Sequence, residues 1–439
     1  MKKVLIITYY WPPSGGGGVH RWLKMQKYLR NFGWQPIIFT PSNPEIGAED
    51  ISLLKDIRHD TEIITLPIWE PYTWYKTFTG KKSDAKVYNA FLTEGKKKAG
   101  WTQRIAEWVR GNFFIPDARK FWINPASKFL KNYLKQHPVD LIISTGPPHS
   151  MHLIAKKVEE AIGIPWIADF RDPWTKIDMY DKLKLTKMAD TYHHYLEKSV
   201  LEQTDHVVAV TWAMAEEFKQ LCPSIKVSVI TNGYDVDDFN VKAVKQLNSP
   251  FVIRYLGSMN ADRNPVDFWE ALATIRAKNA VIFNNIVVEL IGQIDTEVIA
   301  TIEAMQLHKS VLIKPFIPHD AAIEAMINAD LLLIVINKSQ NQSGILPGKM
   351  YEYIGAGKPI LCIGPSHSDA QKLFYQVDAN YFVSYGDSNK IVSLIEKYIT
   401  PTEQNKMSDN QTQKHTQFSR ESLAKDYCEL MNLVINNQL

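Results

Sequence analysis

Short apolar runs alternate with segments of helical periodicity along most of this chain, and that alternation restricts the possible folds more than any other feature. The first apolar run, residues 4–9, leads through a glycine-rich loop into a segment whose apolar residues recur every three or four positions. Gly33 is placed to end that helix, and a second apolar run follows at residues 37–39. Repeated along the chain, this pattern predicts parallel sheets covered by helices on both faces.

The candidate strands form two series. The first comprises residues 4–9, 37–39, 141–144, 166–168, 206–210 and 227–230, and the second comprises residues 252–256, 287–291, 311–313, 331–336 and 360–363. A polar stretch at residues 236–249 separates them and is predicted to be a hinge. A chain of 439 residues is too long for one hydrophobic core, so two domains are expected. The predicted fold is α/β, with two doubly wound Rossmann-like domains, residues 1–240 and 250–400, that face a ligand-binding cleft.

The end of the chain carries one more amphipathic segment. Residues 400–419 are polar and are predicted to be a loop. The segment 420–439 that follows has an apolar stripe at helical spacing, formed by Leu423, Tyr427, Leu430, Met431 and Val434. We expect this helix to pack back on the N-terminal domain, because such a stripe needs an apolar surface to cover it.

Composition excludes several classes of protein. Cys222, Cys362 and Cys428 are far apart and odd in number, so the sequence predicts neither a disulfide framework nor a zinc cluster, and a cytoplasmic location fits best. No stretch approaches the roughly 18 uncharged apolar residues of a membrane-spanning helix. Membrane contact, if it occurs, is therefore expected to be peripheral, at the inner face of the plasma membrane.

The charge of the chain is unevenly distributed. Residues 76–135 hold 14 Lys and Arg against 4 Asp and Glu, whereas the whole chain has a net charge of +3. The stretch 69–135 also contains Trp74, Trp101, Trp108 and Trp122. One reading is a solvated helical insertion with a few core aromatics. The other is a face that binds anionic lipid, since Lys and Arg are attracted to anionic headgroups and Trp prefers the membrane interface. No nucleic-acid partner is expected.

A glycine-rich loop at residues 14–18 follows the first strand and opens a helix. Backbone amides at Gly16 and Gly17 could hold a phosphate or an oxyanion there, although a tight connection would use the same residues. The spacing matches neither a Walker loop nor a dinucleotide fingerprint. The second strand ends in Phe39, Thr40 and Pro41, without the acidic residue that holds a ribose in dehydrogenases.

Polar side chains also follow two later strands. Asp169 and Arg171 come directly after the run 166–168, and His149 follows the turn after the run 141–144. Their position at the carboxyl edge of a parallel sheet predicts either a substrate site or a structural ion-pair cluster. An isolated histidine is more often structural than catalytic, but this location favours a role for His149.

The segment 343–360 is predicted to form a loop, a short helix that ends at a glycine, and a strand. Pro347 lies near the helix start, and Lys349 and Glu352 are three residues apart on one face. A cation there could hold a diphosphate, and a carboxylate could accept two ribose hydroxyls. An ordinary surface ion pair would have the same spacing.

Five motifs together resemble the GT-B glycosyltransferases, specifically the large retaining family four, in family order along nearly the whole chain. The motifs are the glycine-rich loop after the first strand, residues 169–174, residues 232–235 with Phe239, residues 255–258 with Arg263, and residues 347–359. Each motif is modest alone. The resemblance implies a transferase that moves a sugar from a nucleotide-sugar donor, held mainly by the C-terminal domain, to a glycan or lipid-linked acceptor.

The resemblance also implies roles for particular residues. Glu352 matches the glutamate that binds the donor ribose, while Arg263 and Lys349 stand where cations neutralise the diphosphate. Backbone amides near Gly344 and Ile345 are further candidates for the phosphate. The reaction is expected to retain anomeric configuration and to need neither a metal nor a cofactor.

The sequence departs from the family pattern at three places. Gly344 replaces a glutamate that usually contacts the donor sugar, and Ser258 replaces a common phosphate-binding arginine. Arg171 lies near the position of a histidine, so the catalytic role falls to Arg171, Asp169 or His149.

Other functions share parts of this pattern. Asp235 and Asp237 form the DxD string of metal-using transferases, but they lie in the turn before the hinge and are predicted to be structural. A sugar-nucleotide epimerase would have the same two-domain architecture. A nucleotide-sugar or glycan binding protein without catalysis would fit the missing acid at Gly344.

Overall fold

The computed structural model describes residues 1–47, 49–70, 108–109, 111–177, 180, 183–241, 249–339, 341–378, 381–400 and 414–436. The chain forms two compact units, Met1–Thr231 with Leu423–Leu439, and Asn232–Ser422. The first stretch of unit 1 therefore ends at Thr231, nine residues before the domain limit expected from the sequence. The reason is that Tyr234 and Phe239 belong to unit 2, where their rings lie against Gly355 and leave no room for a side chain there.

The sheet of unit 1 has seven parallel strands in the order β3-β2-β1-β4-β5-β6-β7. They are β1 (Lys2–Ile7), β2 (Trp34–Pro41), β3 (Glu62–Leu66), β4 (Leu141–Gly146), β5 (Trp166–Phe170), β6 (His206–Ala209) and β7 (Val227–Val229). Six of the seven were predicted. The strand β3 was missed because it is a short edge strand without a continuous buried face.

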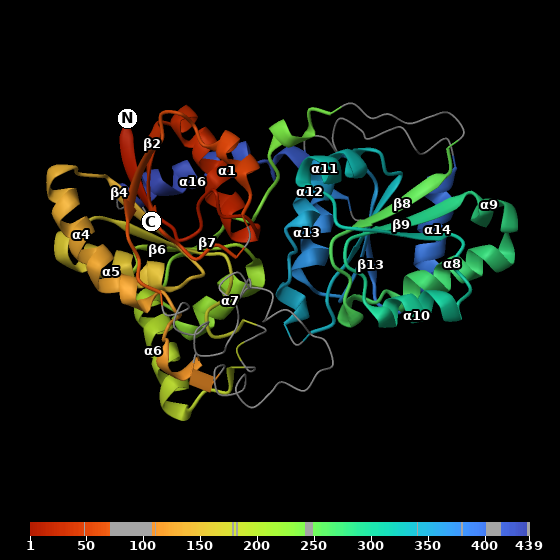
Figure 1. Cartoon of the computed structure of the whole chain (residues 1–439), viewed down its shortest axis with the longest axis horizontal. Helices are drawn as coiled ribbons and strands as arrows, with labels where there is room; N and C mark the ends of the chain where they lie inside the picture. Colours follow the sequence, from red (N-terminus) through yellow and green to blue (C-terminus); the bar gives the residue numbers. More distant parts are fainter. Residues whose placement is uncertain are drawn as a thin grey trace. The chain divides into compact units, whose positions relative to one another are not determined.

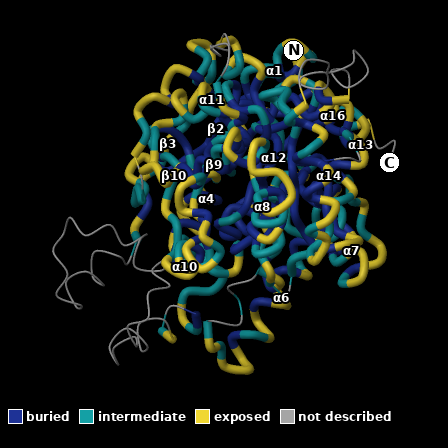
Figure 2. The backbone as a smooth tube through the Cα atoms, turned by 90° about the vertical axis from the view of Figure 1, so that its right-hand side faces the viewer, coloured by how far each residue is buried: buried dark blue, intermediate teal, exposed yellow. Residues whose placement is uncertain are grey.

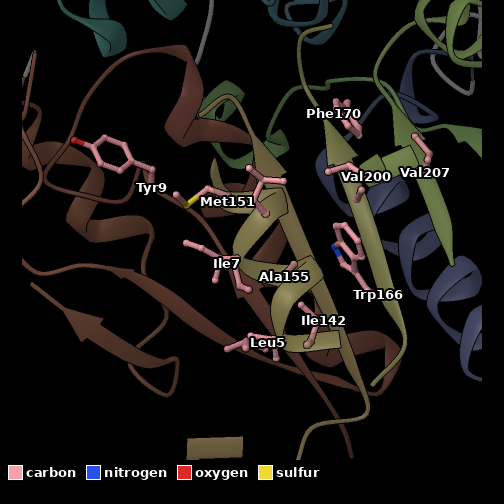
Figure 3. Packing of buried hydrophobic residues seen from close by; sticks show 14 of the residues in the cluster. Leu5, Ile7, Tyr9, Ile142, Met151, Ala155, Trp166, Phe170, Val200 and Val207 are labelled. Carbon is pink, nitrogen blue, oxygen red and sulfur yellow. The ribbon is translucent and has the colours of Figure 1, made fainter. Parts of the chain in front are cut away.

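Helices cover both faces of this sheet (Figure 1). They are α1 (Gly17–Leu29), α4 (Ile123–Gln136), α5 (Ser150–Ile162), α6 (Lys187–Gln203), α7 (Trp212–Leu221) and α16 (Arg420–Ile435). Successive β1 side chains alternate between two cores, because neighbouring residues of a strand point to opposite faces. Leu5 and Ile7 belong to the core that includes α5 residues, and Figure 3 shows Met151 and Ala155 beside them.

The opposite core is completed by the end of the chain. All five residues of the predicted C-terminal stripe are buried there, together with residues of α1. The Tyr427 ring lies edge-on to Trp22 of α1, with 5.0 Å between the ring centroids. The last helix therefore supplies part of the hydrophobic core of unit 1.

Unit 2 has a six-stranded parallel sheet in the order β10-β9-β8-β11-β12-β13. The strands are β8 (Phe251–Leu256), β9 (Ile286–Ile291), β10 (Val311–Lys314), β11 (Leu331–Val335), β12 (Ile360–Gly364) and β13 (Phe382–Ser384). The helices are α8 (Val266–Lys278), α9 (Ala280–Asn284), α10 (Thr296–Ala304), α11 (His319–Ile327), α12 (Lys349–Gly355), α13 (Asp369–Val377) and α14 (Ser388–Ile399). Figure 2 shows the edge strand β10 as more exposed than β9 beside it. The three-residue strand β13 was not predicted.

Each sheet has one point where the strand order reverses. In unit 1 it lies between β1 and β4, and in unit 2 between β8 and β11. Loops that leave the carboxyl ends of two such strands diverge to opposite faces of the sheet, so a crevice opens between them. These two positions are therefore where ligand sites are expected.

Candidate functional site

In unit 2, one arginine spans the reversal point. Arg263 lies in the short 3-10 helix η7 (Ala261–Arg263) that follows β8. Its guanidinium donates hydrogen bonds to the side-chain oxygen of Asn337, which follows β11, and to the Ser258 carbonyl oxygen at 3.0 Å. Arg263 thus joins the loops at the carboxyl ends of the two strands and places a positive charge between them.

Lys349, at the start of α12, reaches the same place. Its ammonium donates to the Leu256 carbonyl oxygen at 2.7 Å and lies 4.3 Å from the centroid of the Tyr255 ring. A side chain at Gly257 would begin 2.7 Å from the Lys349 Nζ, and Gly257 has a φ of +114°. Only glycine therefore suits this position, because any side chain would both strain the backbone and displace the ammonium.

The positive charge of Arg263 affects the protonation of Lys349. Burial, followed by the charge of Arg263, lowers the pKa of Lys349 from 10.5 to about 7, although Glu352 opposes the shift. An anion bound between Lys349 and Arg263 would relieve that repulsion. The site is thus electrostatically suited to a diphosphate.

Glu352 lies one helical turn after Lys349 and is half-buried. Burial raises the pKa of its carboxyl, while His319 is the largest opposing influence. The His319 ring itself lies 3.7 Å from the Asp238 carboxylate. Within the part of the chain that the structure describes, no hydrogen bond to the Glu352 carboxylate is seen. Its oxygens can therefore accept hydrogen bonds from a ligand.

The predicted amide donors of this site are already engaged. The Gly344 amide donates to the Asn341 carbonyl at 3.0 Å, and the Ile345 amide lies 3.5 Å from the Gln342 carbonyl, in the turn η8 (Gln342–Gly344). A phosphate at Gly344 and Ile345 would therefore have to take the place of these hydrogen bonds, and the role of the two amides stays a prediction. The turn uses both amides internally, whereas Lys349 and Arg263 supply the positive charge of this crevice.

An arginine spans the reversal point of unit 1 as well. Arg171, after β5, donates hydrogen bonds to the Gly18 carbonyl in the glycine-rich loop and to the Pro147 carbonyl after β4. A side chain at Gly18 would begin 2.7 Å from the Arg171 guanidinium. Arg171 therefore holds the two loops together, which is a positioning role.

The backbone at Gly16 and Gly17 is open. Gly16 precedes α1 with a φ of +92°, and no atom of the described chain lies within 4 Å of a side chain built at either position. The exposed backbone and the positive end of α1 agree with the predicted capacity for an anion.

His149 begins α5 beside this loop. Its ring stacks on Trp174, with 4.7 Å between centroids and 6° between planes. Burial, with the nearby His152 and Arg171, holds its pKa well below 6.5, so the ring is neutral at neutral pH. Its buried Nδ1 has no hydrogen-bond partner among the described residues. His149 is thus a neutral and largely buried ring beside the loops of the crevice, with a ring nitrogen that can accept a hydrogen bond.

Asp169 does not belong to the open part of the site. Its side chain is fully buried, and it forms an ion pair with Arg21 at 2.9 Å. Trp22 and Thr145 each donate a further hydrogen bond at 2.9 Å. Burial alone would raise its pKa, but Arg21 together with the hydrogen bonds from Trp22 and Thr145 outweighs that effect and holds the pKa below the usual value. This enclosed and fully hydrogen-bonded carboxylate is placed to hold α1 and β5 together, and its predicted catalytic role has no support in the geometry.

Comparison with known proteins adds to this geometry. Residues 86–238 match the family model described as Glycosyltransferase Family 4. Over these residues the chain is similar to family 4 glycosyltransferases, which supports its assignment as a glycosyltransferase. No curated protein sequence matches the chain significantly.

Solved structures share the whole fold of this glycosyltransferase. Sucrose-phosphate synthase from Thermosynechococcus elongatus has a TM-score of 0.60 at 14% identity, covering 100% of both chains. A glycosyltransferase from Rickettsia africae has a TM-score of 0.60 at 14% identity, covering 99% of both. A lipopolysaccharide outer core galactosyltransferase has a TM-score of 0.55 at 13% identity, covering 100% of both. The predicted GT-B fold, with two Rossmann-like units, is thus confirmed.

The glycosyltransferase contains a polar cluster that the sequence did not indicate. Glu70 accepts hydrogen bonds from the Tyr9 hydroxyl at 2.9 Å and forms an ion pair with Arg119 at 3.1 Å. The Arg119 guanidinium also lies 4.4 Å from the Tyr9 ring centroid. Tyr9 follows β1, so the position was predictable, but its partners are 61 and 110 residues away and carry no local signal. Asn337 could have been found, because it follows a predicted strand.

The DxD string of the glycosyltransferase is part of a turn. The Asp235 carboxylate is buried and lies 3.4 Å from the Asp237 amide, at the start of the 3-10 helix η6 (Val236–Phe239). Within the described ranges, no group of three His, Cys, Asp or Glu residues is arranged to hold a metal ion. No helix in those same ranges is long and apolar enough to cross a membrane.

Proposed function

We propose that unit 2 binds the nucleotide-sugar donor at the crevice between β8 and β11. Lys349 and Arg263 would bind the diphosphate, and Glu352 would accept hydrogen bonds from the ribose hydroxyls. The observation that supports this most is the pair of cations at one reversal point, one of them with its pKa lowered to about 7 and so short of a counter-ion. One similar structure, that of a variant of S. aureus TarM, is a complex that contains UDP, so uridine diphosphate is the first nucleotide to test.

Transfer needs a group that stabilises the leaving diphosphate. Lys349 and Arg263 can do so without a metal ion, since fixed positive charges lower the energy of charge that develops in the transition state. We therefore propose a metal-independent reaction with no cofactor. Retention of anomeric configuration is part of the same proposal and has its support in the family resemblance.

The acceptor would bind in unit 1, near His149, while Gly16 and Gly17, with their open backbone, are candidates for contact with the donor. His149 is the group that could accept a proton or orient a hydroxyl, with Arg171 holding the loops around it. We propose that the acceptor is a glycan or is lipid-linked. The enzyme would then act in polysaccharide biosynthesis at the inner face of the plasma membrane. The similarity to a lipopolysaccharide galactosyltransferase supports this class.

The experiment is a thermal shift series with nucleoside diphosphates and their sugars, followed by transfer assays with the donor that binds. A ligand at 100 times its Kd adds about 2.7 kcal/mol to the folded state. Stabilisation by UDP in the wild type, and its loss in Glu352→Ala, would support the donor site. A donor that is turned over without any acceptor would indicate an epimerase, and tight binding without turnover would indicate a binding protein.

A further inference from the structure

Unit 1 carries large apolar side chains on its surface, away from both of its cores. Six of them have exposed fractions from 41% for Trp108 to 86% for Met188, namely Trp108, Phe113, Phe121, Met188, Tyr192 and Tyr195. We call this set the aromatic face. A soluble domain normally buries such residues, and grouped exposure of this kind marks a surface that binds a partner or a membrane.

The first part of the aromatic face is a stripe on α6. Met188, Tyr192 and Tyr195 are four and three residues apart, so they share one side of the helix. The Tyr192 and Tyr195 rings stack with 6.2 Å between centroids. The other side of α6 is buried through residues such as Leu196 and Val200. The helix is thus anchored in the core while its outer side presents apolar groups, and Figure 2 shows buried and exposed residues side by side around α6.

The second part is fixed to the residues that lead into α6. The Thr186 amide donates to the Asn112 side-chain oxygen at 2.6 Å, and the Asn112 amide group donates to the Lys184 carbonyl at 3.4 Å. Trp108 and Phe113, on either side of Asn112, contact each other edge-on at 5.7 Å. Two segments more than 70 residues apart in sequence therefore form one surface.

Phe121 extends this surface. Lys120 donates to the Phe113 carbonyl at 2.6 Å, and its ammonium lies 5.4 Å from the Phe121 ring centroid. The exposed Trp69 ring lies edge-on to Phe121 at 4.8 Å. By contrast, Trp122 is fully buried and stacks on Phe39, so this aromatic of the stretch 69–135 belongs to the core and not to a membrane-binding face. Trp74 and Trp101 lie outside the described residues.

Lysines surround the aromatic face. Lys184, Lys187 and Lys198 are exposed around the α6 stripe. Acids lie among them: Asp190 accepts a hydrogen bond from the Tyr180 hydroxyl at 2.9 Å, and Glu202 lies 3.6 Å from Lys198, so the positive charge of this surface comes mainly from Lys184 and Lys187. Tyr, Trp and Phe interleaved with lysine form the combination that favours the boundary between anionic headgroups and hydrocarbon.

We propose that the aromatic face docks on an anionic lipid bilayer, with the α6 stripe and the Trp108–Phe113 pair entering the interface. This inference rests on the proposed function, since a lipid-linked acceptor requires the enzyme at a membrane. It names a surface that includes α6, which lies outside the basic stretch 69–135 that the sequence singled out.

The test is flotation of the full chain with vesicles of phosphatidylcholine alone or with 30% phosphatidylglycerol added, at low and high salt. Each lysine near an anionic surface contributes about a fivefold gain in partitioning. The double variant Lys184→Glu/Lys187→Glu is therefore expected to bind the anionic vesicles at least tenfold less. The triple variant Met188→Ser/Tyr192→Ser/Tyr195→Ser is expected to lose binding at every salt concentration, because it lacks the apolar contribution.

Matched controls lie elsewhere in unit 1. Ile51→Ser/Leu54→Ser removes exposed apolar groups from another surface, and Lys55→Glu/Lys219→Glu reverses the same number of charges. Both are expected to bind vesicles like the wild type. Equal loss in a control and in its matched variant, or no preference of the wild type for anionic vesicles, would overturn the proposal.

Two further readings separate this inference from the proposed function. UDP binding by all four variants is expected to equal that of the wild type, so its absence in the wild type would count against the donor site and not against docking. Sedimentation velocity without lipid would reveal a protein interface. A change in oligomeric state on loss of the α6 stripe would mean that the face binds another copy of the chain, which would also overturn membrane docking.

Discussion

Lys349 gives the sharpest test of the donor site, because its protonation and the binding of an anionic ligand favour each other. With a pKa of about 7, about half of the Lys349 side chains carry a charge at pH 7 and about 1% at pH 9. If the charged form binds the diphosphate, affinity for UDP falls by about 50-fold over that range, which corresponds to about 2 kcal/mol. The phosphate groups of the ligand are already ionised above pH 7, so they add little to this slope.

Isothermal titration of the wild type and of Lys349→Arg at pH 7, 8 and 9 measures this directly. The guanidinium stays charged throughout, so the variant is expected to show a nearly flat pH profile even if its affinity differs. Lys309→Arg, at an exposed lysine of the same unit, should keep the wild-type slope. Titrations in two buffers of different ionisation enthalpy should also show proton uptake on binding at pH 8. A wild-type affinity that is constant from pH 7 to pH 9 would refute the reasoning.

The same shift has a consequence for stability. Since the folded pKa of Lys349 is lowered, the unfolded chain binds more protons between about pH 7 and pH 10, and the lysine destabilises the fold most at the low end of that range. Lys349→Met should therefore raise the midpoint of thermal unfolding at pH 7 while it weakens UDP binding, and a lowered midpoint would contradict this. Glu352→Ala should weaken binding of nucleotide and nucleotide-sugar alike by about 1.5 to 3 kcal/mol, with Glu352→Gln less affected, and equal affinities by titration would remove Glu352 from the site. Arg263→Ala should lower kcat more than donor affinity in steady-state assays, because its partner gains charge in the transition state, and an effect on KM alone would speak against that role. Asp169→Ala should destabilise the chain by about 3 to 5 kcal/mol in urea unfolding, since Arg21 would be left buried and unpaired, and a stable but inactive variant would restore a catalytic role. Sugar transfer should survive exhaustive chelation by EDTA, and restoration of a lost activity by magnesium or manganese would exclude the metal-independent reaction.

The central strands could be predicted because burial on both faces gives them continuous apolar runs. The edges could not, since β3 exposes alternate residues and β13 has only three. For the donor site, the spacing of Lys349 and Glu352 was sufficient to place them on one helix. The environment of Lys349 also depends on Gly257 and Tyr255, which lie more than 90 residues earlier in the chain. The spacing within the segment 343–360 does not show that these residues come into contact with it.

The candidate catalytic residues Asp169, Arg171 and His149 show a different limit of prediction from sequence. A charged residue after a buried strand looks the same in sequence whether it faces a ligand or an internal partner. Asp169 meets Arg21, 148 residues away, and Arg171 meets the Gly18 carbonyl, 153 residues away. Pairing over such distances is decided by the sheet order, which a single sequence did not provide. The turn that occupies the Gly344 amide is likewise invisible until the backbone path is known.

The last helix of the chain also has a consequence for the time at which unit 1 can fold. Its core needs residues from Leu423 onward, yet the 191 residues from Asn232 to Ser422 are synthesised between Thr231 and Leu423. At about 5 to 20 residues per second, a ribosome takes about 10 to 40 s to add them. During that interval the core residues on this side of unit 1, including Trp22 and Met25 of α1, lack the contacts that Tyr427 and Met431 later provide. The nascent protein therefore presents an uncovered apolar surface until α16 has been synthesised, and such a surface favours aggregation or binding by chaperones.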